Sequence, residues 1–436
     1  MILKNTLRLF ILVSAILSLC CPVTLLAQQE QREVVPGTRI TTLITGNKML
    51  DSTIISVFKR NAPVLFNTPG LPRFAIVGND NKFYFGVGGT IRTTLSYDFK
   101  NPIDNAMYFK TSEIPMDNPR ANNGATQLGV GGSSLFFNFV ALPGSRHQVG
   151  AYVNFNFENP DHGFCLQYAY VTYEGFLGGY TYTAFCDEAA VPPTIDMEGP
   201  PTLPLIQNVA LRYTFNLNNW SLGAAVEAPT IDATFDDHTA SLSQKYPIVP
   251  AFVQYSWRGG ESSVRASAVF RNLNYLNRIN GASEVSTGWG AQLSGKITSS
   301  FNLTTYYQGV YGKGISCMIQ DLCGGGLDFV PDSGKEGAIK PVKLAGGMLG
   351  LQYDFSEKVF CSATYSHVRC YFSDYEEAHV PWREQIRYLQ YFNTNLFWRL
   401  SKNTQLGAEY IHGRKVIMDN QRKSNNRIQV LVQFDF

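Results

Sequence analysis

Apolar and polar residues alternate along most of this chain from residue 82 to residue 436. The first such stretch is "KFYFGVGGTIRTTLSYDF", at residues 82–99. One of its faces carries Phe83, Phe85, Val87, Ile91, Leu95 and Tyr97, and the other carries Tyr84, Gly86, Gly88, Thr90, Arg92, Thr94 and Ser96. Side chains of a β-strand point to opposite faces with a period of two residues, so the pattern predicts a strand with one apolar and one mixed, more polar face.

The same unit recurs to the end of the chain. Further strands are predicted near residues 126–142, 147–158, 163–173, 178–186, 206–217, 219–229, 247–257, 261–272, 285–297, 300–312, 342–355, 358–372, 386–400, 404–415 and 427–436. Tight turns and long polar loops alternate strictly between these strands. That alternation is typical of an all-β fold, a 16-stranded antiparallel transmembrane β-barrel of the porin kind with short periplasmic turns and long external loops. A soluble β-sandwich is the alternative, but it would not divide its connections into two length classes.

The last strand, "RIQVLVQFDF", also has two faces. Ile428, Val430 and Val432 lie on its apolar side, and Arg427 lies on the other. A sheet in hydrocarbon must close on itself, because no backbone amide can be left without a partner. We therefore expect the last strand to pair with the first. The terminal Phe436 resembles the aromatic signal that the barrel-assembly machinery of Gram-negative bacteria recognises.

The first 27 residues predict a secretory signal peptide. Lys4 and Arg8 precede an apolar run that ends near Ala27, where polar residues begin. This order of basic, apolar and small residues is typical of export signals. A transmembrane anchor is the alternative, but Pro22 interrupts the run, which is short for a spanning helix.

We predict that residues 28–80 form a periplasmic segment ahead of the barrel and that the barrel occupies residues 81–436. Leu50, Ile54 and Phe58 recur at helical spacing within "NKMLDSTIISVFKRN" and indicate one short helix. A loosely held tether or a plug under the barrel is an equally good interpretation of this stretch.

Composition supports the barrel and excludes some functions. Aromatic residues make up 13% of the chain, with 29 Phe and 23 Tyr, yet the mean hydropathy is slightly negative. A chain rich in aromatics but not apolar overall suits a barrel with one face to lipid and one to water. Without the signal peptide, the 34 acidic residues are matched by as many basic ones. A neutral chain argues against a nucleic-acid partner.

Alternation places several charged residues on the lumen face. The basic residues predicted to line the pore at middle depths are Arg92, Arg212, Arg265 and Arg271. Lys296 and Arg399 fall nearer the periplasmic end, and the acidic positions are Glu158, Glu227, Asp354 and Glu409. Arginines in a narrow low-dielectric passage attract anions. The alternative is that they only pair with neighbouring acids of the wall.

The loop "DEAAVPPTIDMEGPPTLPLIQN", residues 187–208, is predicted to constrict the pore. Its two Pro-Pro pairs restrict the backbone, as a loop folded stiffly into the lumen requires. Its acidic residues are Asp187, Glu188, Asp196 and Glu198. Facing a basic wall, they would produce a transverse field across the pore. The alternative is a loop packed on the outer rim, with its acids in solvent.

Other motifs do not indicate catalysis. "GVGGT" (86–90) and "GVGGS" (129–133) look like phosphate-binding glycines, but no helix follows, so they are interpreted as relief of crowding in strands. The six histidines show no metal or triad spacing. Cys317 with Cys323, and Cys165 with Cys186, could form disulfides, and free thiols are the alternative. We therefore predict no catalytic residues, no metal and no cofactor.

The segment "RFAIVGNDNKFYFGVGGTIRTTLSYDF" resembles the start of the barrel in DcaP-type porins of Gram-negative bacteria. Gly78 and Asp80 stand at a polar step, and Gly86, Gly88 and Arg92 follow in the first strand. The resemblance implies a homotrimer in the outer membrane that passes small anionic solutes such as dicarboxylates. It also implies a periplasmic coiled coil before the barrel, and this chain departs there because residues 28–70 contain no sustained heptads.

The function expected from these observations is passive diffusion of small hydrophilic solutes through a porin, with a preference for anions. The expected surroundings are outer-membrane lipid, lipopolysaccharide and the barrel-assembly machinery. A more selective channel with a binding site, of the phosphate- or fatty-acid-uptake kind, is the first alternative. A barrel enzyme or an adhesin is the second.

Overall fold

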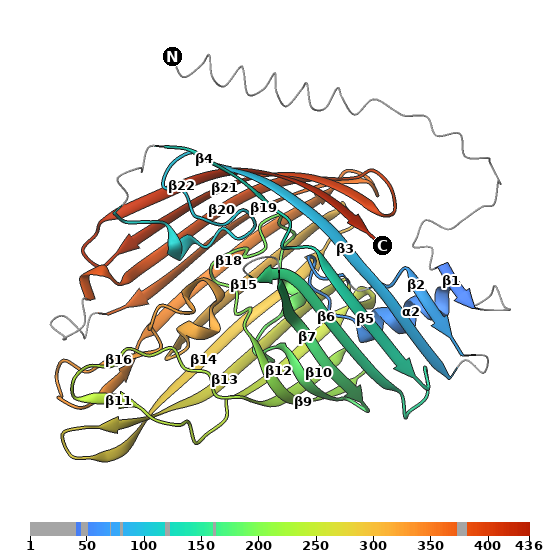
Figure 1. The fold of residues 1–436 in the computed structure, drawn as a ribbon. Helices are drawn as coiled ribbons and strands as arrows, with labels where there is room; N and C mark the ends of the chain where they lie inside the picture. Colours follow the sequence, from blue (N-terminus) through green and yellow to red (C-terminus); the bar gives the residue numbers. More distant parts are fainter. Residues whose placement is uncertain are drawn as a thin grey trace, which may run out of the picture. The chain divides into compact units, whose positions relative to one another are not determined.

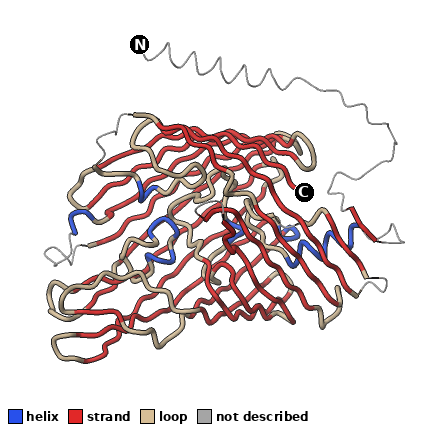
Figure 2. The backbone as a smooth tube through the Cα atoms, in the orientation of Figure 1, coloured by secondary structure: helices blue, strands red, loops and turns tan. Residues whose placement is uncertain are grey.

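The structure, a computed structural model, describes residues 41–44, 51–69, 71–78, 82–117, 123–159, 163–372 and 382–436. The predicted signal peptide, residues 1–27, lies outside the described residues. The strands wind around one closed antiparallel barrel, with β22 beside β3 (Figure 1). Strands dominate the backbone, and the helical pieces are short (Figure 2). Among the described residues, no helix has the length and apolarity needed to cross a membrane.

Twenty strand segments belong to the main sheet. β4 and β5 pair with successive parts of β3 and act as one interrupted strand, while β1, β2 and β11 are short additions, so the wall itself has 16 strands. The segments are β1 (Thr41–Ile44), β2 (Phe74–Val77), β3 (Phe83–Asp98), β4 (Ala125–Gly129), β5 (Ser134–Ala141), β6 (Val149–Asn159), β7 (Gly163–Tyr173), β8 (Phe176–Tyr182), β9 (Gln207–Leu217), β10 (Trp220–Glu227), β11 (Thr239–Ser241), β12 (Val249–Trp257), β13 (Ser262–Asn277), β14 (Ala282–Thr298), β15 (Leu303–Lys313), β18 (Lys343–Asp354), β19 (Val359–Tyr371), β20 (Ile386–Arg399), β21 (Thr404–Ile417) and β22 (Arg422–Asp435). The fold class expected from the sequence is confirmed.

The remaining elements lie outside the main sheet. They are α2 (Asp51–Asn61), the hairpin strands β16 (Phe329–Pro331) and β17 (Ile339–Pro341), and the short 3₁₀ turns η2 (Thr111–Glu113), η4 (Glu188–Ala190), η5 (Arg258–Gly260), η6 (Ser316–Met318), η7 (Gln320–Leu322) and η8 (Trp382–Glu384). We call the end of the barrel where β3 begins the turn end and the opposite end the loop end. The helix α2 lies within the stretch for which the sequence predicted one short helix.

The last strand closes the barrel against the first. β22 pairs with β3 from Asp435 opposite Thr90 to Arg427 opposite Asp98. The ladder reaches the terminal residue. The N–H of Phe436 donates to the carbonyl of Gly89 at 2.9 Å, and the N–H of Gly89 donates to the carbonyl of Phe436 at 2.8 Å. β2 then continues along the same edge of β3 toward the turn end. No part of this edge of β3 is left without a partner strand over these residues.

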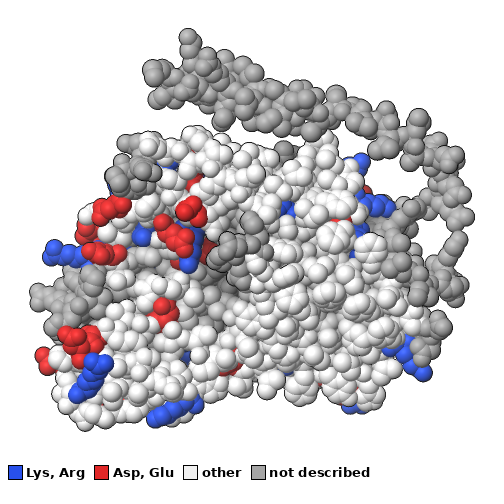
Figure 3. All heavy atoms as spheres, in the orientation of Figure 1, with Lys and Arg blue, Asp and Glu red and all other residues white. Residues whose placement is uncertain are grey.

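The two faces of the wall differ as the alternation requires. On β22, Val430 and Val432 are 42% and 51% exposed, while Leu431 between them is fully buried inside the barrel. On the face drawn in Figure 3, Lys, Arg, Asp and Glu gather toward the ends and leave a broad belt nearly free of charge. The outer surface is therefore an apolar belt, and the polar side chains of the strands point inward.

Two connections at the loop end are shorter than the sequence predicted. Residues 278–281 join β13 to β14, and residues 418–421 join β21 to β22. The expectation that all loop-end connections are long was wrong at these two places and also between β6 and β7, where Asn159 pairs with Gly163. The ladder between β13 and β14 continues as far as Asn277 opposite Ala282, and Leu273 and Tyr275 in this extension are buried against Phe329 of the loop at residues 314–342. The sequence around this hairpin is polar, so it was predicted to be a loop. The hairpin is buried only through contacts with a distant part of the chain.

β8 is also shorter than predicted. It ends at Tyr182, whereas the alternation suggested a strand as far as residue 186. Residues beyond Tyr182 leave the wall and enter the barrel, where Phe185 is fully buried. The apolar residues that looked like the end of a strand are therefore the start of an inserted loop.

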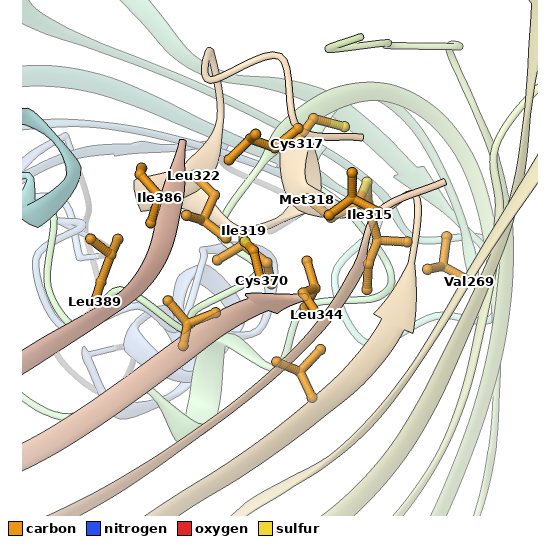
Figure 4. Close-up of a cluster of buried hydrophobic side chains, with 14 of the residues drawn as sticks. Val269, Ile315, Cys317, Met318, Ile319, Leu322, Leu344, Cys370, Ile386 and Leu389 are labelled. Atoms are coloured by element: carbon orange, nitrogen blue, oxygen red, sulfur yellow. The ribbon is translucent and has the colours of Figure 1, made fainter. Parts of the chain in front are cut away.

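An apolar cluster fills part of the barrel toward the loop end. Ile315, Met318, Ile319 and Leu322, from the loop at residues 314–342, pack against inward side chains of β13, β18, β19 and β20. Figure 4 shows these side chains pointing toward Leu344, Cys370 and Leu389 of the wall. Burial of apolar area is the main source of such packing energy. This loop covers part of the lumen instead of extending into solvent.

A buried ion pair joins the first and last strands. Arg427 of β22 donates from Nε and Nη2 to the two carboxylate oxygens of Asp98 of β3, each at 2.8 Å, and both side chains are buried. Arg427 also donates to the carbonyl of Ile103 at 3.2 Å. A two-pronged pair of this kind is geometrically specific. It defines the register of the closing seam.

Replacing Asp98 with Asn should destabilise the barrel strongly, because it leaves the buried Arg427 charge unpaired. A loss of about 3–5 kcal/mol in the free energy of unfolding is expected for breaking a buried pair. Urea unfolding in lipid vesicles, followed by heat-modifiable mobility, measures it. The control is Glu113→Gln, which breaks the mainly exposed pair between Lys110 and Glu113 and should cost about 0–1 kcal/mol. Equal losses in the two variants would contradict the assignment.

Candidate functional site

The loop between β8 and β9, residues 183–206 and called L3 here, lies inside the barrel. Its partners on the wall alternate with residues that face outward. Arg92, which contacts L3, follows Ile91, which is 55% exposed, and Glu409, which also contacts L3, precedes the exposed Tyr410. The wall side chains that hold L3 are therefore the lumen-facing ones.

Buried charges of the wall bind the backbone of L3 at Ile195. Arg92 of β3 donates from Nη2 to the carbonyl of Ile195 at 2.5 Å. Glu409 of β21 accepts hydrogen bonds from the backbone N–H groups of Ile195 and Asp196 at 3.0 and 2.9 Å. One peptide segment is thus bound by an arginine and a carboxylate from two different strands, and hydrogen bonds to charged groups are the stronger class.

A second attachment of the same kind lies at the start of L3. Arg265 of β13 donates to the carbonyl of Ala184 at 2.6 Å, and Glu227 of β10 accepts from the N–H of Ala184 at 2.7 Å. Arg212 of β9 donates to the carbonyl of Tyr182 at 2.5 Å, at the point where the chain leaves the wall. Together these residues turn the chain from β8 into the lumen.

Arg271 of β13 binds two further loops. It forms a buried ion pair with Asp328 at 2.8 Å, donates to the carbonyls of Gly314 and Thr230, and donates to Cys317 Sγ at 2.7 Å. Its partners come from the loops at residues 314–342 and 228–248. Three of the four arginines predicted from the sequence therefore bind loop segments, and Arg212 binds the last residue of β8. Arg92 and Arg271 are almost completely buried.

The four acidic residues of L3 occupy different places. Asp187 accepts a hydrogen bond from Ser294 of β14 at 2.8 Å, and Glu188 accepts one from Tyr168 of β7 at 3.3 Å. Asp196 is fully buried and accepts bonds from Phe109 N and Tyr391 OH. Glu198 accepts from Gln320 at 3.2 Å. The sequence placed these acids in one loop, and the structure distributes them over both sides of it.

Two of the cavities that the described residues line lie along the interior of the barrel. The loop-side cavity, of about 510 Å³, reaches Lys110 and Gln320 in the loops, and the turn-side cavity, of about 860 Å³, reaches Gly260 in a tight turn. The charged residues that line the loop-side cavity are Lys110, Glu113, Glu158 and Glu198. Those that line the turn-side cavity are Lys59, Arg212, Arg265, Lys296, Arg399, Asp187 and Glu188.

The linings of the two cavities differ in the sign of their net charge. Acidic residues outnumber basic ones around the loop-side cavity, and basic residues outnumber acidic ones around the turn-side cavity. Arg212 and Arg265 border the turn-side cavity, whereas Arg92 and Arg271 border neither. The sign of the lining charge changes along the barrel from one cavity to the next, and in the turn-side cavity Asp187 and Glu188 of L3 line the same space as basic residues of the wall.

Some lining residues were missed by the sequence analysis. Lys59 belongs to α2 and Phe66 follows it, and both lie in the stretch that was interpreted only as a helix, tether or plug. No local signal marks them as lining residues, because their position depends on where α2 docks. Gly132 of "GVGGS" does relieve crowding, but in the turn between β4 and β5 and not in a strand: a Cβ there would lie 2.6 Å from Met197 of L3 and 2.8 Å from Arg92.

The cysteines of the barrel and its loops are free thiols in the structure, including both pairs that could have formed disulfides. Cys165 lines the loop-side cavity and Cys186 the turn-side cavity. β8 ends at Tyr182, so Cys186 lies in the inserted loop and not opposite Cys165 in a hairpin.

The buried carboxyl group of Asp196, a residue of L3, has a raised pKa. Burial, and next the negative charge of Glu409, raise the pKa of Asp196 to about 7. The backbone N–H groups of Phe109 and Glu198 and the charge of Arg427 act in the opposite direction but do not cancel the effect. Desolvation favours the neutral form of a carboxyl group. We therefore expect the docking of L3 to depend on pH.

The fold is similar to those of known outer-membrane channels. The outer membrane channel DcaP of Acinetobacter baumannii matches with a TM-score of 0.70 at 17% identity, over 81% of this chain and 97% of that one. An anion-selective porin from Comamonas acidovorans matches with a TM-score of 0.51 at 12% identity, over 81% and 100% of the two chains. OmpF of Salmonella typhi, in complex with daunomycin, matches with a TM-score of 0.53 at 10% identity, over 82% and 99%. The sequence matches no protein-family model and no curated protein.

Replacing Glu409 with Ala should release L3 from the wall. Glu409 also accepts hydrogen bonds from Asn393, Asn395 and Gln429, so the change leaves several buried donors unpaired, at about 1–3 kcal/mol each. Backbone hydrogen exchange of residues 193–199 should accelerate. The matched control is Glu357→Ala, in an exposed turn. Unchanged protection of L3 would show that Glu409 does not hold it.

The docking of L3 should weaken as the pH rises through about 7. Asp196 keeps its proton up to about pH 7 when L3 is docked, whereas an exposed aspartate loses its proton near pH 3.8. Between these two pH values the docked form therefore binds one proton more than the released form. Docking is then strongest at low pH. Exchange of residues 193–199, corrected for intrinsic rates, should be faster at pH 8.5 than at pH 5. Asp196→Asn should abolish the difference, and a pH-independent wild type would refute the expectation.

Proposed function

We propose that this protein is an outer-membrane porin, a passive diffusion channel for small hydrophilic solutes that prefers anions. The observation that carries the proposal is the pair of successive cavities through a closed barrel with an apolar outer belt. A wall of this kind suits lipid on the outside and water within. The loop end would face the exterior and the turn end the periplasm, as in barrels with short periplasmic turns.

The charge of the turn-side cavity supports a preference for anions. Five basic side chains and two acidic ones line it. Lys296 and Arg399 are the informative members, because each lies near the turn end of its strand and neither donates to L3. Fixed positive charge in a narrow aqueous passage raises the local concentration of anions. The acidic loop-side cavity opposes this preference, so the net effect depends on which cavity is narrower.

The comparisons agree with this proposal at the level of the fold. Two of the similar structures are described as a channel and as an anion-selective porin. Residues 1–27 would direct export, and Phe436, at the end of the seam, would be recognised during barrel assembly. The apolar belt would contact lipid and lipopolysaccharide. A homotrimer is part of the proposal, and an oligomer that resists dodecyl sulfate and dissociates on heating would support it.

Replacing both Lys296 and Arg399 with Ala should reduce the preference for anions. A charge at ~8 Å contributes about 0.5 kcal/mol even in bulk water, with opposite sign for an anion and a cation. Losing two should therefore disfavour anions by roughly fivefold and favour cations by a similar factor, so the anion-to-cation permeability ratio should fall. Reversal potentials in planar bilayers with a salt gradient measure this ratio. Lys402→Ala, in an exposed turn outside both cavity linings, is the control.

The outcomes separate the two parts of the proposal. Single-channel steps with an unchanged reversal potential in the double variant would keep the channel and remove the role of the turn-side charges. No conductance at any voltage, in wild type and variants alike, would refute the channel itself.

A further inference from the structure

Part of the chain ahead of the barrel enters the lumen. Residues 51–69, which we call the N-terminal segment, contain α2 and eight residues after it, and they lie inside the wall. Ile54, Val57 and Phe58 of α2 are buried against Tyr84 of β3 and Val140 of β5. Tyr84 alternates with the outward-facing Phe83 and Phe85, so this contact is in the lumen.

The end of α2 is attached to the wall by hydrogen bonds. Asn61 donates to Asn138 Oδ1 at 2.7 Å, accepts from Thr172 Oγ1 at 3.0 Å, and its carbonyl accepts from Tyr170 OH at 2.8 Å. Asn138 in turn donates to the carbonyl of Phe58 at 3.1 Å. The last carbonyls of a helix lack partners within it, and here wall side chains supply them. The wall also leaves space for this contact, because a Cβ on Gly150 would overlap Asn61 Oδ1.

After α2 the segment crosses the lumen. Phe66 packs edge-on against Phe397 of β20, with ring centroids 5.3 Å apart, and contacts Phe360 of β19. Asn67 then accepts a hydrogen bond from Arg92, and the carbonyl of Pro69 accepts one from Tyr152 OH at 2.5 Å. β20 and β5 are separated around the barrel by β21, β22 and β3. The segment therefore spans part of the cross-section between two distant parts of the wall.

Phe66 lies at the junction of the two cavities. It lines both of them, and Val191 of L3 is the one other residue that does so. Phe66 is still 36% exposed although it lies inside the barrel, which is consistent with a side chain that borders open space. Both linings thus include one residue of the N-terminal segment and one of L3, and a direct path between the two cavities would run between these segments.

We propose that the N-terminal segment forms one side of the channel constriction and that Phe66, opposite Val191, is the residue that sets its width. This inference rests on the proposed channel function. It assigns size selection to residues ahead of the barrel as well as to L3. The constriction is apolar and lies between an acidic and a basic cavity, so passage is limited there by size and by desolvation rather than by charge.

Single-channel conductance of the full-length protein in planar bilayers tests the proposal. Phe66→Ala should raise conductance by roughly 1.5- to 2-fold, because conductance through a narrow passage follows its cross-section, and Phe66→Trp should lower it. Phe301→Ala removes the same atoms from a turn where the ring is 80% exposed, and it should leave conductance unchanged. Gly150→Ala changes the wall and not the sequence of the N-terminal segment; it should displace Asn61 and loosen the attachment of the segment, and it should also raise conductance.

The outcomes distinguish this proposal from the channel function on which it rests. Equal conductance of wild type, Phe66→Ala and Phe66→Trp would overturn the constriction and leave the channel intact. Silence of every variant would instead refute the channel. If Phe66→Ala does not fold, lower conductance of Phe66→Trp together with higher conductance of Gly150→Ala supports the proposal, and no change in either overturns it.

Discussion

Buried charges that bind loop backbone determine the interior of this barrel. At Ile195 and again at Ala184, an arginine of the wall binds the carbonyl and a glutamate of the wall binds the N–H. Such charges are costly to bury unless they are paired and hydrogen-bonded. The loop backbone meets that requirement, and the wall in return holds the loop inside. Neither partner would be stable in this arrangement without the other.

A wall of sixteen strands encloses more space than its own side chains can fill. Among the described residues the space is taken by L3, the loop at residues 314–342, the loop residues 99–117 after β3, and α2 with the residues that follow it. The apolar cluster around Ile319 and the one around Phe58 bury these insertions against the wall. What remains open is a pair of cavities that meet at Phe66 and Val191. The dimensions of the passage are thus set by inserted segments and not by the number of strands.

Much of the architecture could be predicted from alternation alone. The face of each strand followed from the period of two, and the closure of β22 on β3 followed from the requirement that edge amides be paired. Arg92, Arg212, Arg265 and Arg271 were assigned to the lumen face by the same pattern. Their partners could not be predicted, because those partners are backbone atoms of loops, and any sequence can supply a backbone carbonyl. For the same reason the sequence could not show that these arginines attach segments of the chain to the wall, although Arg212 and Arg265 also border the turn-side cavity.

The sequence by itself determined that this chain forms a closed barrel with an apolar outside. Alternation is visible within each strand, and closure is required because every edge amide in hydrocarbon needs a partner. Only the tertiary structure decided what lies inside. The extended hairpin of β13 and β14, the early end of β8 at Tyr182, and the position of Phe66 all depend on contacts between segments far apart in the chain. Those contacts leave no periodic mark on the sequence, because an inserted loop has no repeat that fixes which of its residues face the wall.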